Sequence, residues 1–391
     1  MFVSKLYINR PCCHKNQIES KSHRERFHLS RTRVRMDYSK NSILNLTVLS
    51  LLSSAIILLC FLSATRFPRP CPAPNPASVH APPAVDGLGS ALARAATPDK
   101  TLIIAVVNRA YAEQGVDSDK TMLGLFLESF WLGEGTRGLL DHVLVVAVDE
   151  VAYQRCLFQR LHCYRLETEG VDFRGEVVYM SEGFVKMMWA RTLFLTEVLR
   201  RGYSFVFTDT DIMWLRNPFM RLSRNQSIDL QISTDLFNSE LRPENLINTG
   251  FYFVRSNNKT VALFEMWYAR KDNATGKKEQ DVLQELARDG VFRELGLNVR
   301  FLNTRYFSGF CKDSKDIGAV CTVHANCCRS IGAKVFDLTA VLQDWKRFRQ
   351  SGKEANSTVG GGANGTVAPY RWSAHVSCWR SWSVGNSTPI S

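Results

Sequence analysis

This sequence of 391 residues lacks several features that would indicate common functions. It has no Gly-x-x-x-x-Gly-Lys-Ser/Thr motif, so residues 360–362, which are all glycine, predict a flexible loop and not a P-loop. It has no internal repeat, which argues against a repeat architecture. No Cys-x-x-Cys pair occurs in residues 311–328, which argues against a zinc site there and favours disulfides.

Charged residues are missing from residues 43–62, a segment about long enough to cross a hydrocarbon core of ~30 Å at ~1.5 Å per residue. Residues 1–42 carry ten Lys or Arg against three acidic residues, more than half of the net charge of +12. These basic residues are not interleaved with aromatic residues in a folded context, so they do not indicate nucleic acid binding. A basic flank instead keeps the N-terminus in the cytosol and sends the following chain across the membrane. We therefore expect a cytosolic tail at 1–42 and a type II signal anchor at 43–63.

A cleaved signal peptide is the alternative to an anchor. It would need a basic region of more than forty residues, and Ser63-Ala64-Thr65 is only a passable cleavage site. The eight prolines of residues 66–98 predict a stiff, non-folding stem at 64–99, followed by a luminal domain at 100–391. The last part of this domain, from about residue 350, is expected to be an irregular extension.

The luminal assignment agrees with cysteine usage and with glycosylation motifs. Eight of the eleven cysteines follow the anchor, where an oxidising compartment permits disulfides. Six Asn-x-Ser/Thr acceptors also follow it, which favours a Golgi membrane protein with its main domain in the lumen. These acceptors are Asn225, Asn258, Asn273, Asn356, Asn364 and Asn386.

The luminal domain alternates apolar runs with amphipathic segments. Strands are expected at Thr101–Val107, His142–Val148, Glu176–Tyr179, Ser204–Thr208, Leu230–Thr234 and Thr249–Val254. Helices are expected at Lys120–Leu132, Glu150–Leu161, Phe184–Arg201, Thr260–Ala269 and Glu279–Arg288. This alternation predicts a single α/β domain with a mostly parallel central sheet.

Two aspartates follow the apolar strand Ser204–Thr208. Because alternate side chains of an extended segment point the same way, Asp209 and Asp211 should emerge on one face, where their charges repel unless a cation lies between them. Mg²⁺ or Mn²⁺ usually takes one or two protein carboxylates and completes its shell with water and phosphate oxygens. The pattern predicts a metal–diphosphate site, although a polar turn after a core strand would also give it. Asn108 ends another strand and should lie in the same cleft, since ligands of parallel sheets bind at the carboxyl ends of the strands.

Three further motifs accompany the aspartates: Leu246-Ile-Asn-Thr-Gly-Phe-Tyr-Phe-Val254, Glu279-Gln-Asp-Val-Leu283 and Thr322-Val-His-Ala-Asn-Cys-Cys328. From about Thr101 to Trp345 the chain resembles the plant nucleotide-diphospho-sugar transferases of glycosyltransferase family seventy-seven, which are related to the glycogenin-like glycosyltransferases. The resemblance implies a GT-A (Rossmann-like) fold, a nucleotide-sugar donor, Mn²⁺ or Mg²⁺, and transfer with retention of configuration. It also implies a Golgi enzyme that builds a plant cell-wall glycan or a glycoprotein.

The resemblance suggests which residues bind the metal and the donor. It implies metal ligands at Asp209 and Asp211, with the first also near the ribose, and a third ligand at His324. A structural role for His324 is the alternative, in which case His375 is the next candidate ligand. It further implies that Lys334 and Arg191 contact the donor diphosphate, with Asn108 and Lys186 as further donor-binding candidates. A plain surface charge is the alternative for Lys186.

The remaining candidates concern the sugar and the acceptor. Gly250 would let the backbone approach a sugar closely, and Asn248 and Thr249 could bind hydroxyls, although a plain strand start would look the same. The resemblance places Gln280 and Asp281 beside the anomeric carbon, whereas helix caps are the alternative. Trp214 could stack on a sugar ring or fill the core.

The resemblance predicts a transfer mechanism and leaves alternatives. Retention requires a double displacement or a front-face attack, and because Gln280 is a poor nucleophile we expect front-face attack. Glycoside hydrolysis is disfavoured, since it needs two carboxyl groups that flank the bond. An inactive glycan-binding or scaffold protein of the same fold and a metal-dependent phosphodiesterase remain the competing hypotheses.

Overall fold

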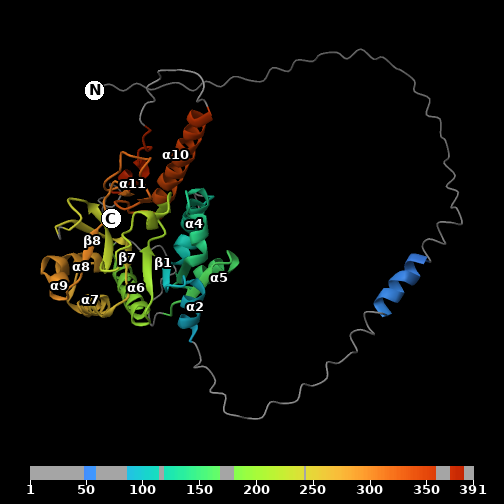
Figure 1. Ribbon diagram of the computed structural model, residues 1–391, viewed down its shortest axis with the longest axis horizontal. Coiled ribbons are helices and arrows are strands. Elements are labelled where there is room, and N and C mark those ends of the chain that lie inside the picture. The colour runs from blue at the N-terminus through green and yellow to red at the C-terminus, as the bar shows by residue number, and fades with distance from the viewer. Residues whose placement is uncertain are drawn as a thin grey trace, which may run out of the picture. The chain divides into compact units, whose positions relative to one another are not determined.

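The computed structural model describes residues 48–58, 86–113, 119–167, 180–241, 244–357 and 370–382. The chain falls into two units, residues 1–80 and 81–391. In the first unit, residues 48–58 form the blue helix of Figure 1, which exposes apolar side chains such as Leu51 and Ile56. Within the described residues, no helix is both long enough and apolar enough to span a bilayer. Of the anchor expected at 43–63, only residues 48–58 are described, and the anchor stays a prediction.

The second unit is built on a seven-stranded sheet. Its strands lie in the order β3 (His162–Arg165), β2 (Val143–Ala147), β1 (Thr101–Val107), β4 (Ser204–Thr208), β7 (Leu246–Val254), β6 (Leu230–Leu236) and β8 (Val299–Phe301). Each neighbouring pair is parallel except the pairs that β7 makes with β4 and β6. The predicted α/β domain with a mostly parallel sheet is therefore confirmed.

Helices cover both faces of this sheet. One face packs against helices α2 (Gly87–Ala95), α6 (Glu182–Arg200), α7 (Asn258–Ala269), α8 (Glu279–Arg288) and α9 (Val291–Glu294). The other face packs against α3 (Arg109–Ala112), α4 (Met122–Leu132) and α5 (Glu150–Phe158). The 3₁₀ turns η1 (Arg137–His142), η2 (Pro218–Met220) and η3 (Lys271–Asn273) complete the connections.

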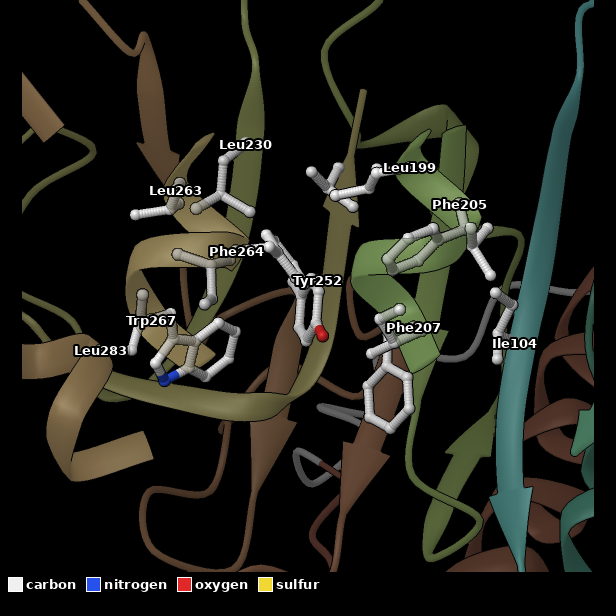
Figure 2. Packing of buried hydrophobic residues seen from close by; sticks show 14 of the residues in the cluster. Ile104, Leu199, Phe205, Phe207, Leu230, Tyr252, Leu263, Phe264, Trp267 and Leu283 are labelled. Atoms are coloured by element: carbon white, nitrogen blue, oxygen red, sulfur yellow. The ribbon is translucent and has the colours of Figure 1, made fainter. Parts of the chain in front are cut away.

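Alternation along the strands explains why they are apolar on both sides. In β1, Leu102 and Ile104 belong to the first core, whereas Ile103 and Ala105 belong to the second. Figure 2 shows the first core, where Phe205 and Phe207 of β4 lie beside Tyr252 of β7. Continuous burial of this kind produces the uninterrupted apolar runs seen in the sequence.

A second, three-stranded sheet lies beyond the aspartate pair. It consists of β5 (Ile212–Trp214), β10 (Thr322–His324) and β9 (Phe307–Gly309), in that order. A third core joins β5 and β10 to α4 and to helix α10 (Ile331–Ser357), which in turn contacts α11 (Val376–Arg380). In Figure 1, α10 and α11 lie together at one end of the domain. No strand or helix was expected between Arg288 and the C-terminus, so this layer is a finding of the structure.

Three sequence-based expectations need correction, and one lies outside the described residues. The non-folding stem was expected to reach residue 99, but α2 begins at Gly87 and buries Leu88, Ala91, Leu92 and Ala95 against the sheet. The helix expected at Glu150–Leu161 ends at Phe158, and His162–Arg165 forms the edge strand β3 instead. Residues 350–357 continue α10, and α11 follows, so the C-terminal extension is not wholly irregular. The strand expected at Glu176–Tyr179 falls outside the described residues.

Three disulfides link the described residues. They join Cys156 to Cys163, Cys311 to Cys327 and Cys328 to Cys378. Bonds among Cys311, Cys321, Cys327 and Cys328 were expected, and Cys311–Cys327 is one of them, whereas Cys321 is buried as a free thiol. Cys328 pairs instead with α11, which ties the C-terminal helix to the loop after β10.

Leu92→Ala tests whether α2 belongs to the folded domain. Leu92 is fully buried in the first core, so we expect the substitution to lower the free energy of unfolding by about 2–5 kcal/mol. Thermal unfolding of the full-length protein measures the change, with Arg94→Ala on the exposed face of α2 as the control. If Leu92→Ala and Arg94→Ala have the same free energy of unfolding, residues 87–95 would belong to the stem that the sequence predicted to end at residue 99.

Candidate functional site

A cavity of about 370 Å³ opens at the carboxyl ends of the central strands. Its lining comes from the ends of β1 and β4, from the start of β7, from α6 and from the N-terminus of α8. The opposite wall comes from the segment after β9, which includes β10, the cysteine-rich loop and α10. The cavity is therefore formed on one side by the ends of the central strands and on the other by residues that follow β9 in the sequence.

The aspartate pair lies in this cavity, and β10 brings His324 to it. Strand β10 pairs with β5 in antiparallel register, so that His324 lies opposite Ile212, the residue after Asp211. The Nε2 atom of His324 is 3.3 Å from Asp211 Oδ1 and 3.9 Å from Asp209 Oδ2. One ligand atom from each of the three residues lies within 4.8 Å of the other two. Two carboxylates and one imidazole in this arrangement fit a hard divalent cation.

Gly250 makes the cluster sterically possible. Its carbonyl accepts a hydrogen bond of 2.7 Å from the backbone N–H of Asp209, which fixes the backbone where β4 ends. A Cβ atom at this position would lie 2.4 Å from His324 Cε1 and 2.9 Å from Asp209 Oδ2. Glycine is therefore required by the close approach of β7 to the three candidate ligands.

Lys334 of α10 neutralises Asp211. Its Nζ atom is 2.8 Å from Asp211 Oδ2. Burial by itself would raise the pKa of Asp211, but Lys334 and His324 hold that pKa well below its usual range. Burial would lower the pKa values of Lys334 and His324, and the negative charge of Asp211 raises both of them overall. Asp211 is thus held as a carboxylate.

Arg191 of α6 pairs with Asp209, but it does not offset the effect of burial on that carboxyl group. One guanidinium nitrogen is 3.1 Å from Asp209 Oδ1, and another is 2.6 Å from Glu279 Oε1. Burial raises the pKa of Asp209 to about 6, with Arg191 opposing the shift and Asp211 adding to it. Arg191 is almost fully buried, so it acts as a fixed positive charge between two acidic residues.

Glu279 is a cavity residue that we did not single out from the sequence. It is 1% exposed, and its Oε1 also accepts a hydrogen bond of 2.8 Å from Thr249 Oγ1. Its other oxygen, Oε2, is buried without a hydrogen-bond partner among the described residues. Unsatisfied buried acceptors are rare, and this one belongs to a residue that lines the cavity. In the sequence, Glu279 stands beside Gln280 at the start of a predicted helix. An acidic residue is common there because it interacts favourably with the helix dipole, so its position did not point to the cavity.

Gln280 and Asp281 have different positions: the first lies in the cavity, and the second caps the N-terminus of α8. Gln280 lines the cavity, and its Oε1 accepts a hydrogen bond of 3.1 Å from the backbone N–H of Thr249. Asp281 accepts one of 3.2 Å from the backbone N–H of Lys278, as in a capping box. Asp281 does not line the cavity among the described residues, so the cap alternative replaces its catalytic assignment.

The two asparagines expected from the sequence, Asn108 and Asn248, also line the cavity. Asn108 caps the short helix α3, where its side chain accepts from the backbone N–H of Tyr111 at 3.3 Å. Asn248 donates to Asp235 Oδ1 at 2.9 Å and accepts from the backbone N–H of Gly250 at 2.9 Å. Both lie in the cavity as expected, although each already has partners within the protein.

Three sequence candidates lie elsewhere. Trp214 is fully buried, stacks on Phe130 and donates to Thr208 Oγ1, so it cannot contact a sugar. Lys186 forms an exposed ion pair with Glu182 and lines a different cavity across α6. His375 stacks on Phe310 and pairs with Asp313 at 3.0 Å. It therefore does not belong to the cluster of Asp209, Asp211 and His324.

Comparisons with known proteins identify what the chain is similar to. A protein-family model described as nucleotide-diphospho-sugar transferase matches residues 138–338. An uncharacterized protein of Arabidopsis thaliana is 56% identical over 307 residues, which cover 78% of this chain and 87% of that protein. The beta-arabinofuranosyltransferase RAY1 of Arabidopsis thaliana is 25% identical over 236 residues, 56% of this chain and 41% of that protein.

A solved structure of the galactosyltransferase LgtC, in complex with donor and acceptor sugar analogs, is also similar. It is 12% identical, with a TM-score of 0.35 over 57% of this chain and 86% of that one.

His324→Ala tests the third metal ligand. If the imidazole ligates the ion, Mn²⁺ affinity measured by calorimetry on the full-length protein should fall about 10–100-fold. His375→Ala should leave the affinity unchanged, because that side chain pairs with Asp313 outside the cluster. A normal Mn²⁺ titration of His324→Ala, with a lowered thermal midpoint, would assign His324 a structural role.

Gly250→Ala tests the close approach of β7. The added methyl group must displace His324, so both Mn²⁺ affinity and donor binding should be lost while the fold is kept. Gly138→Ala is the control, since a Cβ there meets nothing within 4 Å. Wild-type Mn²⁺ binding in Gly250→Ala would contradict the tight cluster.

Proposed function

Because the chain belongs to the nucleotide-diphospho-sugar transferase family, we propose that it transfers a sugar from a UDP-sugar to a carbohydrate acceptor with the help of Mn²⁺ or Mg²⁺. A GT-A type of fold is part of this proposal. One observation supports it most: Asp209, Asp211 and His324 converge within 4.8 Å in a cavity at the strand ends. The intact cluster argues against an inactive scaffold protein, which would have no use for it.

The donor diphosphate would bind between the cluster and α10. The two carboxylates and His324 are the residues that would hold the cation, and the cation would supply positive charge to the departing diphosphate. Lys334 adds a second positive charge from the same wall of the cavity, 2.8 Å from Asp211. Both charges would stabilise the transition state most, since negative charge grows on the leaving group as the glycosidic bond breaks.

The groups near the reacting sugar favour front-face attack. Gln280 is uncharged and a poor nucleophile, and Glu279 is held by Arg191 at 2.6 Å and by Thr249 at 2.8 Å. In a front-face reaction, the acceptor oxygen forms a bond to the anomeric carbon as the bond to the phosphate oxygen breaks. The leaving UDP keeps that electron pair and takes the acceptor proton. Gln280 and Glu279 would then stabilise the positively charged sugar, and the product would retain its configuration.

The transferred sugar and the location are finer parts of the proposal. Relatives include an arabinofuranosyltransferase and a UDP-D-xylose:L-fucose alpha-1,3-D-xylosyltransferase of Arabidopsis thaliana, which favour a pentose donor. A UDP-galactose:fucoside alpha-3-galactosyltransferase of Dictyostelium discoideum is the reason to keep galactose as the other candidate. We propose a plant cell-wall glycan or glycoprotein as the acceptor. The basic tail, the uncharged segment at 43–62 and the disulfides favour a single-pass type II protein of the Golgi membrane with a luminal catalytic domain.

Asp211→Asn tests the proposal through UDP release. The substitution keeps the shape of the side chain but removes one charge from a site that holds its cation mainly by charge. Release of UDP from UDP-arabinofuranose, UDP-xylose or UDP-galactose with Mn²⁺ should therefore fall by about 100-fold or more. Asp316→Asn, in an exposed ion pair with Arg305, is the matched control. EDTA-sensitive release at the wild-type rate in Asp211→Asn would contradict the strand-end site.

A further inference from the structure

The cavity rim carries an aromatic side chain that the donor does not account for. Trp382 lies just after α11 and is the one tryptophan among the described residues that line the cavity. It is 41% exposed, whereas His324 and Lys334 are largely buried. A half-exposed indole beside a polar cluster is therefore a rim feature, at the side of the cavity that faces solvent.

The protein holds this indole in a fixed position. Its Nε1 donates a hydrogen bond of 2.7 Å to the carbonyl of Cys327, and the guanidinium of Arg329 lies 3.9 Å from the ring centroid. The backbone N–H of Arg329 donates to Ser381 Oγ at 3.0 Å, and the Cys328–Cys378 disulfide closes the same connection. Four separate links thus tie residues 378–382 to the loop after β10.

The loop also carries backbone strain at the residue that binds the indole. Cys327 has a φ of +52°, in the left-handed region that residues other than glycine rarely adopt. This conformation belongs to the residue whose carbonyl accepts from Trp382. Strained residues of this kind persist where the surrounding structure fixes them, and they cluster at binding sites. Neither core packing nor the metal cluster requires a tryptophan to be held half in solvent.

We propose that Trp382 is the acceptor platform, on which a sugar ring of the incoming glycan stacks before transfer. This inference rests on the proposed function. The negative face of the indole suits the C–H bonds on one face of a sugar ring, and a rigid aromatic surface is typical of ligand sites. The donor diphosphate would be bound by Lys334 and by the cation at the cluster of Asp209, Asp211 and His324. The rim is therefore left for the acceptor glycan. Arg329 contributes a cation–π contact that helps to hold the ring in place.

Two tryptophans allow a matched test in the full-length protein. Trp379 lies one turn earlier and is 56% exposed, but it does not line the cavity among the described residues. We would compare Trp382→Ala, Trp382→Phe and Trp379→Ala, each with its thermal midpoint. The probes are UDP with Mn²⁺, measured by calorimetry, and soluble arabino-, galacto- and xylo-oligosaccharides, measured by saturation-transfer NMR in the presence of UDP and Mn²⁺.

Trp382→Ala should weaken oligosaccharide binding about tenfold, in line with the usual strength of a stacked aromatic contact. It should leave UDP–Mn²⁺ affinity within about twofold of the wild type, since the phosphate partners are untouched. Trp382→Phe keeps a smaller ring and should give an intermediate loss, which preserves the test if the alanine variant fails to fold. Trp379→Ala should bind every probe as the wild type does.

Several results would overturn the platform. The first is that the wild-type protein binds none of the oligosaccharides. The second is that Trp379→Ala and Trp382→Ala lose oligosaccharide affinity equally. The third is that Trp382→Ala loses affinity for UDP but keeps its affinity for the oligosaccharide. The last result would make Trp382 a stacking surface for the nucleotide base. Failure of the wild type to bind UDP with Mn²⁺ would instead contradict the proposed function, and the oligosaccharide arm would still decide whether Trp382 binds a glycan.

Discussion

Repulsion between the carboxylates of Asp209 and Asp211 is the constraint on which the site depends. Two negative charges separated by a single residue at the end of a buried strand need nearby positive charges, and each carboxylate is paired with a different basic residue. Arg191 of α6 lies 3.1 Å from Asp209, and Lys334 of α10 lies 2.8 Å from Asp211. The pair is therefore balanced by two helices that are far apart in the sequence, and it keeps its remaining oxygens near His324 for a cation.

The small sheet makes the second half of this arrangement possible. Pairing of β10 with β5 sets His324 opposite Ile212, and a shift of one residue would turn the imidazole to the other face of the strand. The same segment continues into the loop held by the Cys311–Cys327 and Cys328–Cys378 disulfides, and from there to Trp382. Residues 322–334 thus supply the third candidate ligand and the second positive charge, and their loop holds Trp382 at the rim of the cavity.

Local signals in the sequence predicted the parts of the site that lie on strands. The apolar run Ser204–Thr208 and the spacing of Asp209 and Asp211 correctly indicated a strand end, and both aspartates line the cavity. Glu279 escaped notice because its importance comes from a 2.6 Å contact with Arg191, which is 88 residues away. The strands after Arg288 escaped notice because β8, β9 and β10 have three residues each, too few to show a period. Sugar stacking and core packing both stayed open for Trp214, because an apolar strand end and a sugar platform have the same composition, and only its burial decides for the core.

Electron spin-echo spectroscopy of bound Mn²⁺ tests the central claim most directly, because it detects nitrogen ligands of the ion without any assay of turnover. The account predicts coupling to the nitrogen of one imidazole in the full-length protein with UDP present. In His324→Gln, this coupling should disappear while some Mn²⁺ stays bound through Asp211. An ion that shows no imidazole coupling in the wild type, or the same coupling in His324→Gln, would contradict a metal site formed by the strand-end aspartates and His324.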